Sequence, residues 1–567
     1  MRKTAYILII FFTVIIAYQK SAKVPFLFDD TDLIINNPQI KNFNHINKIL
    51  TSDFFEQKQT VQGKGIGYYR PVVILSYMLD YKIWGLNAKG FHYTNILLHS
   101  INSVLLFLII FFLCDDLFFS FCCGLIFSVH PVQSESVIWI SGRTDLFGVL
   151  FFFSSFYLYL LYKNKKNKTV LALSLLFYAF GVLSKEFAII LPALLLCFDY
   201  IYSEKKDKTI FLNYPLYSYF LIGFSYFILR KAVLNISNPF FNQGSALDRV
   251  YTFIFSGIPY YFSKLVFPYN LNVYIDFQIQ QFRLSNLIIL ILAICACMFF
   301  LKKYYNKISS LAVLFICFLI ISIIPFSNVL PFSLAPDSEI SVAERFLYLT
   351  SSAFCFLIAR IIFLFKRVFL RKTIVILTVI SYIVLLNIRI TDWLNEETLL
   401  SKSLKNYPDS KLMLNKLGDI YENRGKFKEA MIYYEKVYLM NYRYIGVNNN
   451  IGAVYMKTGD YDKALKYFED EIFFNGENAV VYNNMGLAFF YKNMIRESLA
   501  NFSKALQIYP GYCEAYNNTG VVFASINKTE EAERFFNYAL SISPDYEAPK
   551  KNLGLLRESV RRNYSEK

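Results

Sequence analysis

The apolar residues follow two different patterns along the chain. Up to about residue 390, long apolar runs alternate with short polar or basic loops, and eleven of the runs can cross a bilayer as helices. These runs are 4–19, 92–113, 117–133, 146–162, 169–184, 187–202, 211–229, 285–301, 308–325, 345–365 and 373–389. Beyond residue 410 the chain is polar and periodic. We therefore expect an all-α protein with a membrane helix bundle at 1–390, a linker at 391–410 and a helical repeat domain at 411–567.

The composition agrees with a polytopic membrane protein. The chain is 55% hydrophobic and only 18% charged, with a mean hydropathy of +0.37. The net charge of +16 does not indicate nucleic-acid binding, because many lysines lie in short loops between apolar runs. Most of the nine cysteines lie within apolar runs and none forms a CxxC pair, so we expect no structural disulfides. The first run lacks a convincing cleavage site, which favours an uncleaved helix.

The basic loops indicate how the chain is oriented. The loops at 163–168, 205–208, 302–307 and 366–372 fall on the same side as Arg2 and Lys3. The positive-inside rule makes that side cytoplasmic and places the C-terminal domain outside. We interpret 231–284 as re-entrant or interfacial, with Tyr260, Tyr261 and Tyr269 at the depth of the interface. A composition rich in Phe, Ile, Asn and Lys favours a bacterial inner membrane with the repeats in the periplasm.

Several charged stretches then share the outer face, next to helix ends. They are 29–32, 67–71, 130–145, 184–186 and 343–345. A charge near bilayer depth is costly unless it is paired or faces a cavity. Each charge alone could be an interfacial anchor, but together they suit a site that handles a phosphate and a proton.

These stretches also resemble a known family. The segments FDDTDLI, YYRPVVILSYMLDYKIWGLNAKGFHYTNILLHSIN, FSVHPVQSESVIWISGRTD, LSKEFAIILPALL and AERFLYL are similar to the transmembrane and tetratricopeptide-repeat (TMTC-like) proteins, which are O-mannosyltransferase relatives with the GT-C fold. The resemblance implies transfer of mannose or another hexose from a polyprenyl-phosphate donor to Ser or Thr of extracytoplasmic proteins. It also implies a catalytic carboxylate in the first outer loop, where this chain has Asp29 and Asp30. The mannosyltransferases carry Asp-Glu there, so the sugar stays open.

Other residues in these stretches suit the same reaction. Arginine can bond two phosphate oxygens at once, which makes Arg70, Arg143 and Arg345 candidates for the donor phosphate, with Lys185 as a point charge. The supporting candidates are Tyr69, His130, Glu135 and Glu186. The histidine spacing is not a ligand motif, so we expect no metal site, although a divalent-metal requirement stays open and the cofactor is unknown.

The C-terminal half contains a repeat of 34 residues. Its glycines are Gly418, Gly452, Gly486, Gly520 and Gly554. Small residues follow twelve positions later, at Ala430, Ala464, Ser498 and Ala532. This spacing is typical of the tetratricopeptide repeat, in which the glycine lets paired helices approach closely. We expect four repeats and a terminal helix from Glu547.

A column of asparagines also follows the repeat, two residues before each glycine after the first. It consists of Asn450, Asn484, Asn518 and Asn552. Asparagine both donates and accepts hydrogen bonds, so this column could hold an extended acceptor peptide. Asparagine is also common at this position in such repeats generally.

Two other functions stay open for the whole chain: a non-catalytic membrane scaffold for protein assembly, and a transferase acting on lipid or polysaccharide.

Overall fold

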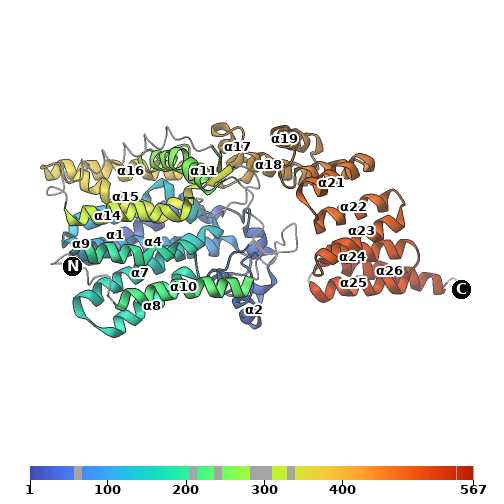
Figure 1. The fold of residues 1–567 in the computed structure, drawn as a ribbon, viewed down its shortest axis with the longest axis horizontal. Coiled ribbons are helices and arrows are strands. Elements are labelled where there is room, and N and C mark those ends of the chain that lie inside the picture. Colours follow the sequence, from blue (N-terminus) through green and yellow to red (C-terminus); the bar gives the residue numbers. More distant parts are fainter. Residues whose placement is uncertain are drawn as a thin grey trace. The chain divides into compact units, whose positions relative to one another are not determined.

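The computed structural model describes residues 1–55, 67–202, 214–234, 245–280, 309–327, 339–544 and 546–565. These residues are helical almost throughout, and they divide into two compact units at Pro408–Asp409 (Figure 1). The predicted run 285–301 lies outside the described residues. Each of the other ten predicted runs contains a helix.

The first unit is a bundle of long helices. Its longer helices are α1 (Arg2–Tyr18), α3 (Pro71–Trp84), α4 (Ala88–Cys114), α5 (Leu117–Val129), α7 (Arg143–Lys165), α8 (Lys168–Val182), α9 (Leu191–Tyr202), α10 (Tyr214–Leu234), α14 (Ser310–Ile323), α15 (Leu347–Ile362), α16 (Val368–Trp393) and α17 (Glu396–Asn406). Its shorter elements are α2 (Ile46–Leu50), α6 (Ser134–Ile138), α11 (Ala246–Thr252), α12 (Ile258–Val266), β1 (Ile275–Gln278) and β2 (Glu339–Val342).

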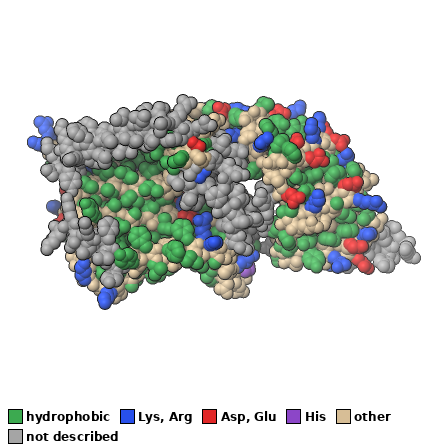
Figure 2. Space-filling view, viewed as in Figure 1, with side chains coloured by type: hydrophobic (Ala, Val, Ile, Leu, Met, Phe, Trp, Pro, Cys, Tyr) green, Lys and Arg blue, Asp and Glu red, His purple; other side chains and the backbone are tan. Residues whose placement is uncertain are grey.

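Among the described residues of this unit, five helical segments are long and apolar enough to cross a membrane. They are Arg2–Lys23, Ala88–Cys114, Ile140–Lys165, Glu344–Ile362 and Val368–Trp393. A sixth span would combine α5 with Pro131–Ile138, which are bent by 49° at the intervening break. Hydrophobic side chains predominate on the part of this unit's surface that Figure 2 shows in colour, as expected for a surface that faces lipid. The chain is therefore an integral membrane protein.

Helix α5 lies at the centre of the bundle. It packs against α1, α4, α15 and α16, and nine of its thirteen residues are buried. A Cβ on Gly124 would lie 2.9 Å from Ile10 and 3.1 Å from Phe107, so glycine allows α1 and α4 to approach α5. Helix α5 begins where the Asp116 side chain accepts a bond from Phe119 N, and it ends at Val129, two residues before Pro131.

The segment from α11 to β1 differs in part from the interfacial prediction. Neither α11 nor α12 meets the criteria for a span, but Tyr260 and Tyr261 are buried against β2 and α15 instead of lying at an interface. Their phenols fill a small core around a two-stranded antiparallel sheet in which Ile275 opposes Val342. Tyr269 is exposed, and its place at the depth of the interface stays a prediction.

The second unit is a stack of helix pairs. Its helices are α18 (Lys411–Asn423), α19 (Phe427–Met440), α20 (Val447–Lys457), α21 (Tyr461–Asn475), α22 (Ala479–Tyr491), α23 (Ile495–Ile508), α24 (Cys513–Ser525), α25 (Thr529–Ile542) and α26 (Glu547–Ser565). These are the four predicted pairs and the terminal helix. In the third pair, the Ser498 hydroxyl donates to the Gly486 carbonyl at 2.8 Å, so serine adds a bond where the other repeats have alanine.

The repeat glycines allow close contact with an aromatic ring of the partner helix. A Cβ on Gly486 would lie 2.7 Å from the buried ring of Phe502, whereas a Cβ on Gly554 would meet nothing within 4 Å.

We therefore expect Gly486→Ala to destabilise the repeats by about 1–3 kcal/mol through overpacking. The matched variant Gly554→Ala should be neutral or slightly stabilising, because alanine favours a helix over glycine. Thermal denaturation of the purified full chain would measure both, and equal effects would contradict this packing account.

Candidate active site at one end of the helix bundle

The polar stretches predicted to share one side meet at one end of the bundle. Hydrogen bonds or ion pairs join 29–32 to 141, 70 to 186, and 345 to 135. The contacts connect loops that are far apart in the sequence, so they are a property of the fold. The side of the membrane on which this end lies stays a prediction.

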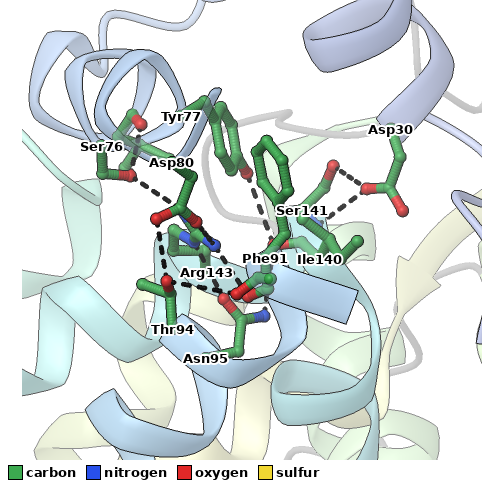
Figure 3. A network of polar contacts seen from close by, with 12 residues as sticks. Asp30, Ser76, Tyr77, Asp80, Phe91, Thr94, Asn95, Ile140, Ser141 and Arg143 are labelled. Carbon is green, nitrogen blue, oxygen red and sulfur yellow. Dashed lines mark hydrogen bonds and ion pairs between the residues drawn. The ribbon is translucent and has the colours of Figure 1, made fainter. Parts of the chain in front are cut away.

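The two candidate carboxylates have different surroundings. Asp30 is only 1% exposed, and its Oδ2 accepts from Leu27 N at 3.0 Å. Its Oδ1 accepts from Ser141 N at 2.9 Å and from the Ser141 hydroxyl (Figure 3). Asp29 is partly exposed, and its charge acts on Arg345. Phe28 precedes them with φ at +51°, a conformation uncommon for a non-glycine residue, which helps to turn the chain here.

Burial raises the pKa of Asp30 to about 7, although the bonds from Leu27 and Ser141 oppose this shift. The negative charge of Asp29 raises it further. Asp30 therefore ties the first loop to the start of α7, whereas Asp29 is the carboxylate that solvent can reach.

Arg143 occupies a closed polar pocket between α3, α4 and α7 (Figure 3). It is fully buried, and its Nη2 lies 2.6 Å from Asp80 Oδ2. Its Nε donates to Asn95 at 2.8 Å, and its Nη2 donates to the Phe91 carbonyl at 2.9 Å. The ring of Tyr77 covers the guanidinium at 4.9 Å. These contacts satisfy the charge internally, so we no longer include Arg143 among the phosphate ligands.

The other three predicted cations lie close together, and each has a carboxylate partner. Arg70 Nη2 lies 2.7 Å from Glu186, Lys185 Nζ lies 2.5 Å from Asp145, and Arg345 Nη1 lies 2.5 Å from Glu135. The side chains of Arg70 and Arg345 are 12% and 20% exposed. Within the described chain, Nη1 of Arg70 and both Nε and Nη2 of Arg345 make no hydrogen bond, so these atoms can meet a ligand.

Electrostatics links these pairs. Burial lowers the pKa of Lys185 to about 8, with Asp145 opposing the shift and Arg70 and Arg345 reinforcing it. Burial opposes ionisation of Glu186, but Arg70 outweighs it and holds the pKa of Glu186 below its usual value. An added anion would relieve the repulsion that Lys185 experiences from the two arginines.

Aromatic rings hold the two arginines in position. Arg70 Cζ lies 5.4 Å from the ring centroid of Phe54 and 4.4 Å from that of Tyr68. Arg345 lies over Trp139 at 5.2 Å and over Phe346 at 5.1 Å. Such stacking orients a guanidinium without using its N–H groups.

Two supporting candidates have structural contacts. The Tyr69 hydroxyl donates to the Leu50 carbonyl at 2.8 Å, and His130 Nε2 lies 3.1 Å from the Leu265 carbonyl. Both side chains are buried. Glu135 and Glu186, in contrast, form ion pairs with Arg345 and Arg70, and their supporting role in the reaction stays a prediction. Within the described residues, no group of three or more His, Cys, Asp and Glu side chains is arranged to hold a metal ion.

Three site residues could not be assigned a role from the sequence. Asp145 pairs with Lys185, Ser141 holds Asp30, and Asp80 neutralises Arg143. Asp145 and Ser141 lie within a polar stretch that we noted, and Asp80 lies within a segment quoted for the family resemblance, but the pairings depend on the fold. Arg143 and Asp145 are two residues apart on α7, yet Arg143 pairs with Asp80 on α3 and Asp145 pairs with Lys185.

The asparagine column of the repeats makes bonds across each repeat boundary. Asn484 Nδ2 donates to Asn449 at 2.9 Å, and Asn518 Nδ2 donates to Asn483 at 3.0 Å. Asn552 repeats the pattern with Asn517 at 2.8 Å, and Asn450 donates to Asn415 at 3.2 Å. One amide N–H of each asparagine therefore joins neighbouring repeats. Binding of an extended peptide by the column stays a prediction.

Comparison with known proteins finds matches to the two halves of the chain. The tetratricopeptide-repeat family model matches residues 413–443 and 445–470. The crystal structure of MamA protein is 21% identical and covers 27% of this chain and 82% of its own, with a TM-score of 0.23.

The curated relatives extend into the membrane half. Protein O-mannosyl-transferase F38B6.6 of Caenorhabditis elegans is 26% identical over 439 residues, which is 73% of this chain and 60% of the relative. Human protein O-mannosyl-transferase TMTC3 is 24% identical over 460 residues, 74% of this chain and 49% of the relative. The chain thus spans about half to three fifths of the length of these relatives. As its motifs indicated, the curated relatives of this chain are TMTC protein O-mannosyl-transferases.

Proposed function

We propose that this chain is a membrane glycosyltransferase that moves a hexose from a polyprenyl-phosphate donor to Ser or Thr hydroxyls of proteins outside the cytoplasm. The observation that carries the proposal is the partly exposed carboxylate of Asp29 within electrostatic reach of Arg345. Kinship with protein O-mannosyl-transferases supports the class of reaction. The N-terminus would then be cytoplasmic and the repeats periplasmic, in a bacterial inner membrane.

In this proposal Asp29 is the general base. The acceptor hydroxyl loses its proton to the Asp29 carboxylate as its oxygen attacks C1 of the sugar. The bond between C1 and the phosphate oxygen breaks, and the electron pair leaves with the polyprenyl phosphate. Partial exposure suits Asp29 to this role, because the acceptor must reach it.

The phosphate is held by cations that already converge. Arg345 offers Nε and Nη2, and Arg70 offers Nη1, while Lys185 adds a nearby charge. Such preorganised donors stabilise charge that develops on the leaving group without reorganising during the reaction. Glu135, Asp145 and Glu186 keep the cations in place before the donor binds.

The repeats would recruit the acceptor polypeptide. The Oδ1 atoms of Asn484 and Asn552 accept no hydrogen bond within the described residues, so they can accept from peptide N–H groups. We therefore propose that the asparagine column contributes acceptors to a peptide, while its N–H groups hold the repeats together.

The two carboxylates allow a matched test. We expect Asp29→Asn to keep normal abundance and lose transfer by ~10²–10⁴-fold, because asparagine cannot take the proton. Asp30→Asn should instead destabilise the protein by about 1–3 kcal/mol, because its amide would face the Leu27 N–H. Transfer of radiolabelled mannose from polyprenyl-phosphate mannose to a Ser/Thr peptide would measure activity. Wild-type rates in a folded Asp29→Asn variant would refute the base and favour the scaffold function.

The raised pKa of Asp30 predicts a pH effect on stability. The folded chain binds a proton at Asp30 below a pKa of about 7, whereas the ordinary carboxyl pKa of 3.8 applies once the chain unfolds. Between these values the folded state binds more protons, so this group's contribution to stability falls as pH rises. The melting temperature of the wild type minus that of Asp30→Asn should therefore increase as pH falls from about 8 to 5. A difference that does not change with pH would contradict the raised pKa.

The role of the repeats can be tested by deleting Asp409–Lys567. We expect transfer to folded protein acceptors to fall strongly, while transfer to a short Ser/Thr peptide persists, since only large acceptors need a second binding surface. Parallel assays with both acceptors would measure the ratio of the two rates. An equal loss with both acceptors, at normal membrane abundance, would mean that the repeats do not recruit.

A further inference from the structure

Arg389 is a buried cation that the proposed reaction does not use. It lies one turn before the end of α16, and it is 5% exposed. Its Nε and Nη2 atoms have no hydrogen-bond partner among the described residues. A buried donor without an acceptor costs free energy, and the cost is greater for a charged group. The position therefore calls for an acceptor that the described chain does not supply.

The nearest carboxylate does not fill this need. Asp392 Oδ2 lies 3.6 Å from Arg389 Nη1, which is too far for a good hydrogen bond. The Oδ1 atom of Asp392 bonds to Lys402 instead. One carboxylate thus serves two cations, and the buried Nε and Nη2 atoms are left without an acceptor.

Trp393 adds a third unmet donor on the neighbouring turn. Its side chain is fully buried, and its indole Nε1 has no partner among the residues that the structure describes. Arg389 Cζ lies 5.7 Å from the centroid of the Trp393 ring. These two side chains, one turn apart on α16, therefore present three donor nitrogen atoms that lack acceptors among the described residues.

These donors lie beside the candidate active site. The ring centroid of Phe28, the residue before Asp29, lies 6.3 Å from that of Trp139 and 6.5 Å from that of Trp393, with the rings packed edge to face. Arg345 covers Trp139, and Arg389 covers Trp393. The charge of Arg389 also acts on Glu135, the partner of Arg345. The two arginines thus lie on the two tryptophans that contact Phe28.

We propose that Arg389 and Trp393 form a binding site for a phosphate oxyanion. A phosphate offers several acceptor oxygens and a negative charge, which match a guanidinium fork and an indole N–H. A sugar hydroxyl would accept a bond but would not balance the charge. If its phosphate belongs to a polyprenyl lipid, the site is a second phosphate site beside the cations that we assign to the donor, and it rests on the proposed function. If it takes free phosphate, it stands apart from that function.

The alternative is that Arg389 only balances the charges of Glu135 and Glu344, on which its charge acts. That role needs no ligand and leaves Nε and Nη2 unmet. The two roles differ in whether Arg389 variants change phosphate binding by a folded protein.

Tryptophan fluorescence can measure this binding, because the chain has only three tryptophans and Trp393 is one of them. The full chain in lipid nanodiscs would carry Trp84→Phe to lower the background. The probes would be a polyprenyl monophosphate and, separately, inorganic phosphate. We expect a saturable change in fluorescence as the probe is added. Arg389→Gln should lower the affinity for the probe by about 10–100-fold, and Arg389→Lys should lower it less, since lysine keeps the charge without the fork.

Two further variants serve as controls. Arg360→Gln removes an exposed arginine near the C-terminal end of α15, away from Arg345, which lies just before its N-terminal end. This variant should bind both probes like the parent. Trp393→Phe should lose most of the signal. Size-exclusion profiles would verify folding, and Arg389→Lys keeps the test usable if Arg389→Gln does not fold.

The outcomes separate this site from the proposed function. Arg389-dependent binding of either probe supports the site, and the preferred probe identifies the source of the phosphate. Parent-like affinity in a folded Arg389 variant, or no binding of either probe to the parent, overturns it. Because this assay needs no sugar transfer, a failed transferase assay would leave the binding result intact.

Discussion

Charge buried between apolar helices must be neutralised, and the loop end of the first unit depends on this constraint. Several kcal/mol are lost when one partner of a buried ion pair is left alone. The pairs Arg70–Glu186 and Arg345–Glu135 join residues 116 and 210 positions apart, so they fix loops that no local interaction would hold together. A site for an anionic donor can be built this way, because cations held by carboxylates are already desolvated and oriented when the donor arrives.

The helices could be predicted from the sequence because hydrophobic length is a local property. Each described apolar run contains a helix, and the glycine spacing indicates the paired helices of the repeats. Lengths were less predictable: α5 ends at Val129 and the chain bends at Pro131, because proline cannot donate to the helix. The burial of Tyr260 and Tyr261 also could not be predicted, since it depends on β2, far away in the sequence.

The site was predictable only as a set of candidates. The polar stretches indicated which residues could meet, and Asp29, Arg70, Lys185 and Arg345 do lie at one end of the bundle. Arg143 has the same residue type and a similar local sequence setting, yet Asp80 and Asn95 enclose it. Whether an arginine faces a ligand or a buried carboxylate depends on the packing of helices distant in sequence. Asp29 and Asp30 differ for the same reason, since only Asp30 reaches Ser141.

The asparagine bonds between repeats have a mechanical consequence. Each bond joins residues 35 positions apart, so one rung connects each helix pair to the pair before it. Rotating one pair against its neighbour would stretch a rung, so the rungs resist changes in the curvature of the superhelix. The rung from Asn552 to Asn517 holds the terminal helix α26 in the same way. Because successive helix pairs are joined in this way, a strain applied at one end of the stack would be transmitted to the other end. A polypeptide that binds along the stack would therefore contact a surface that deforms as one unit.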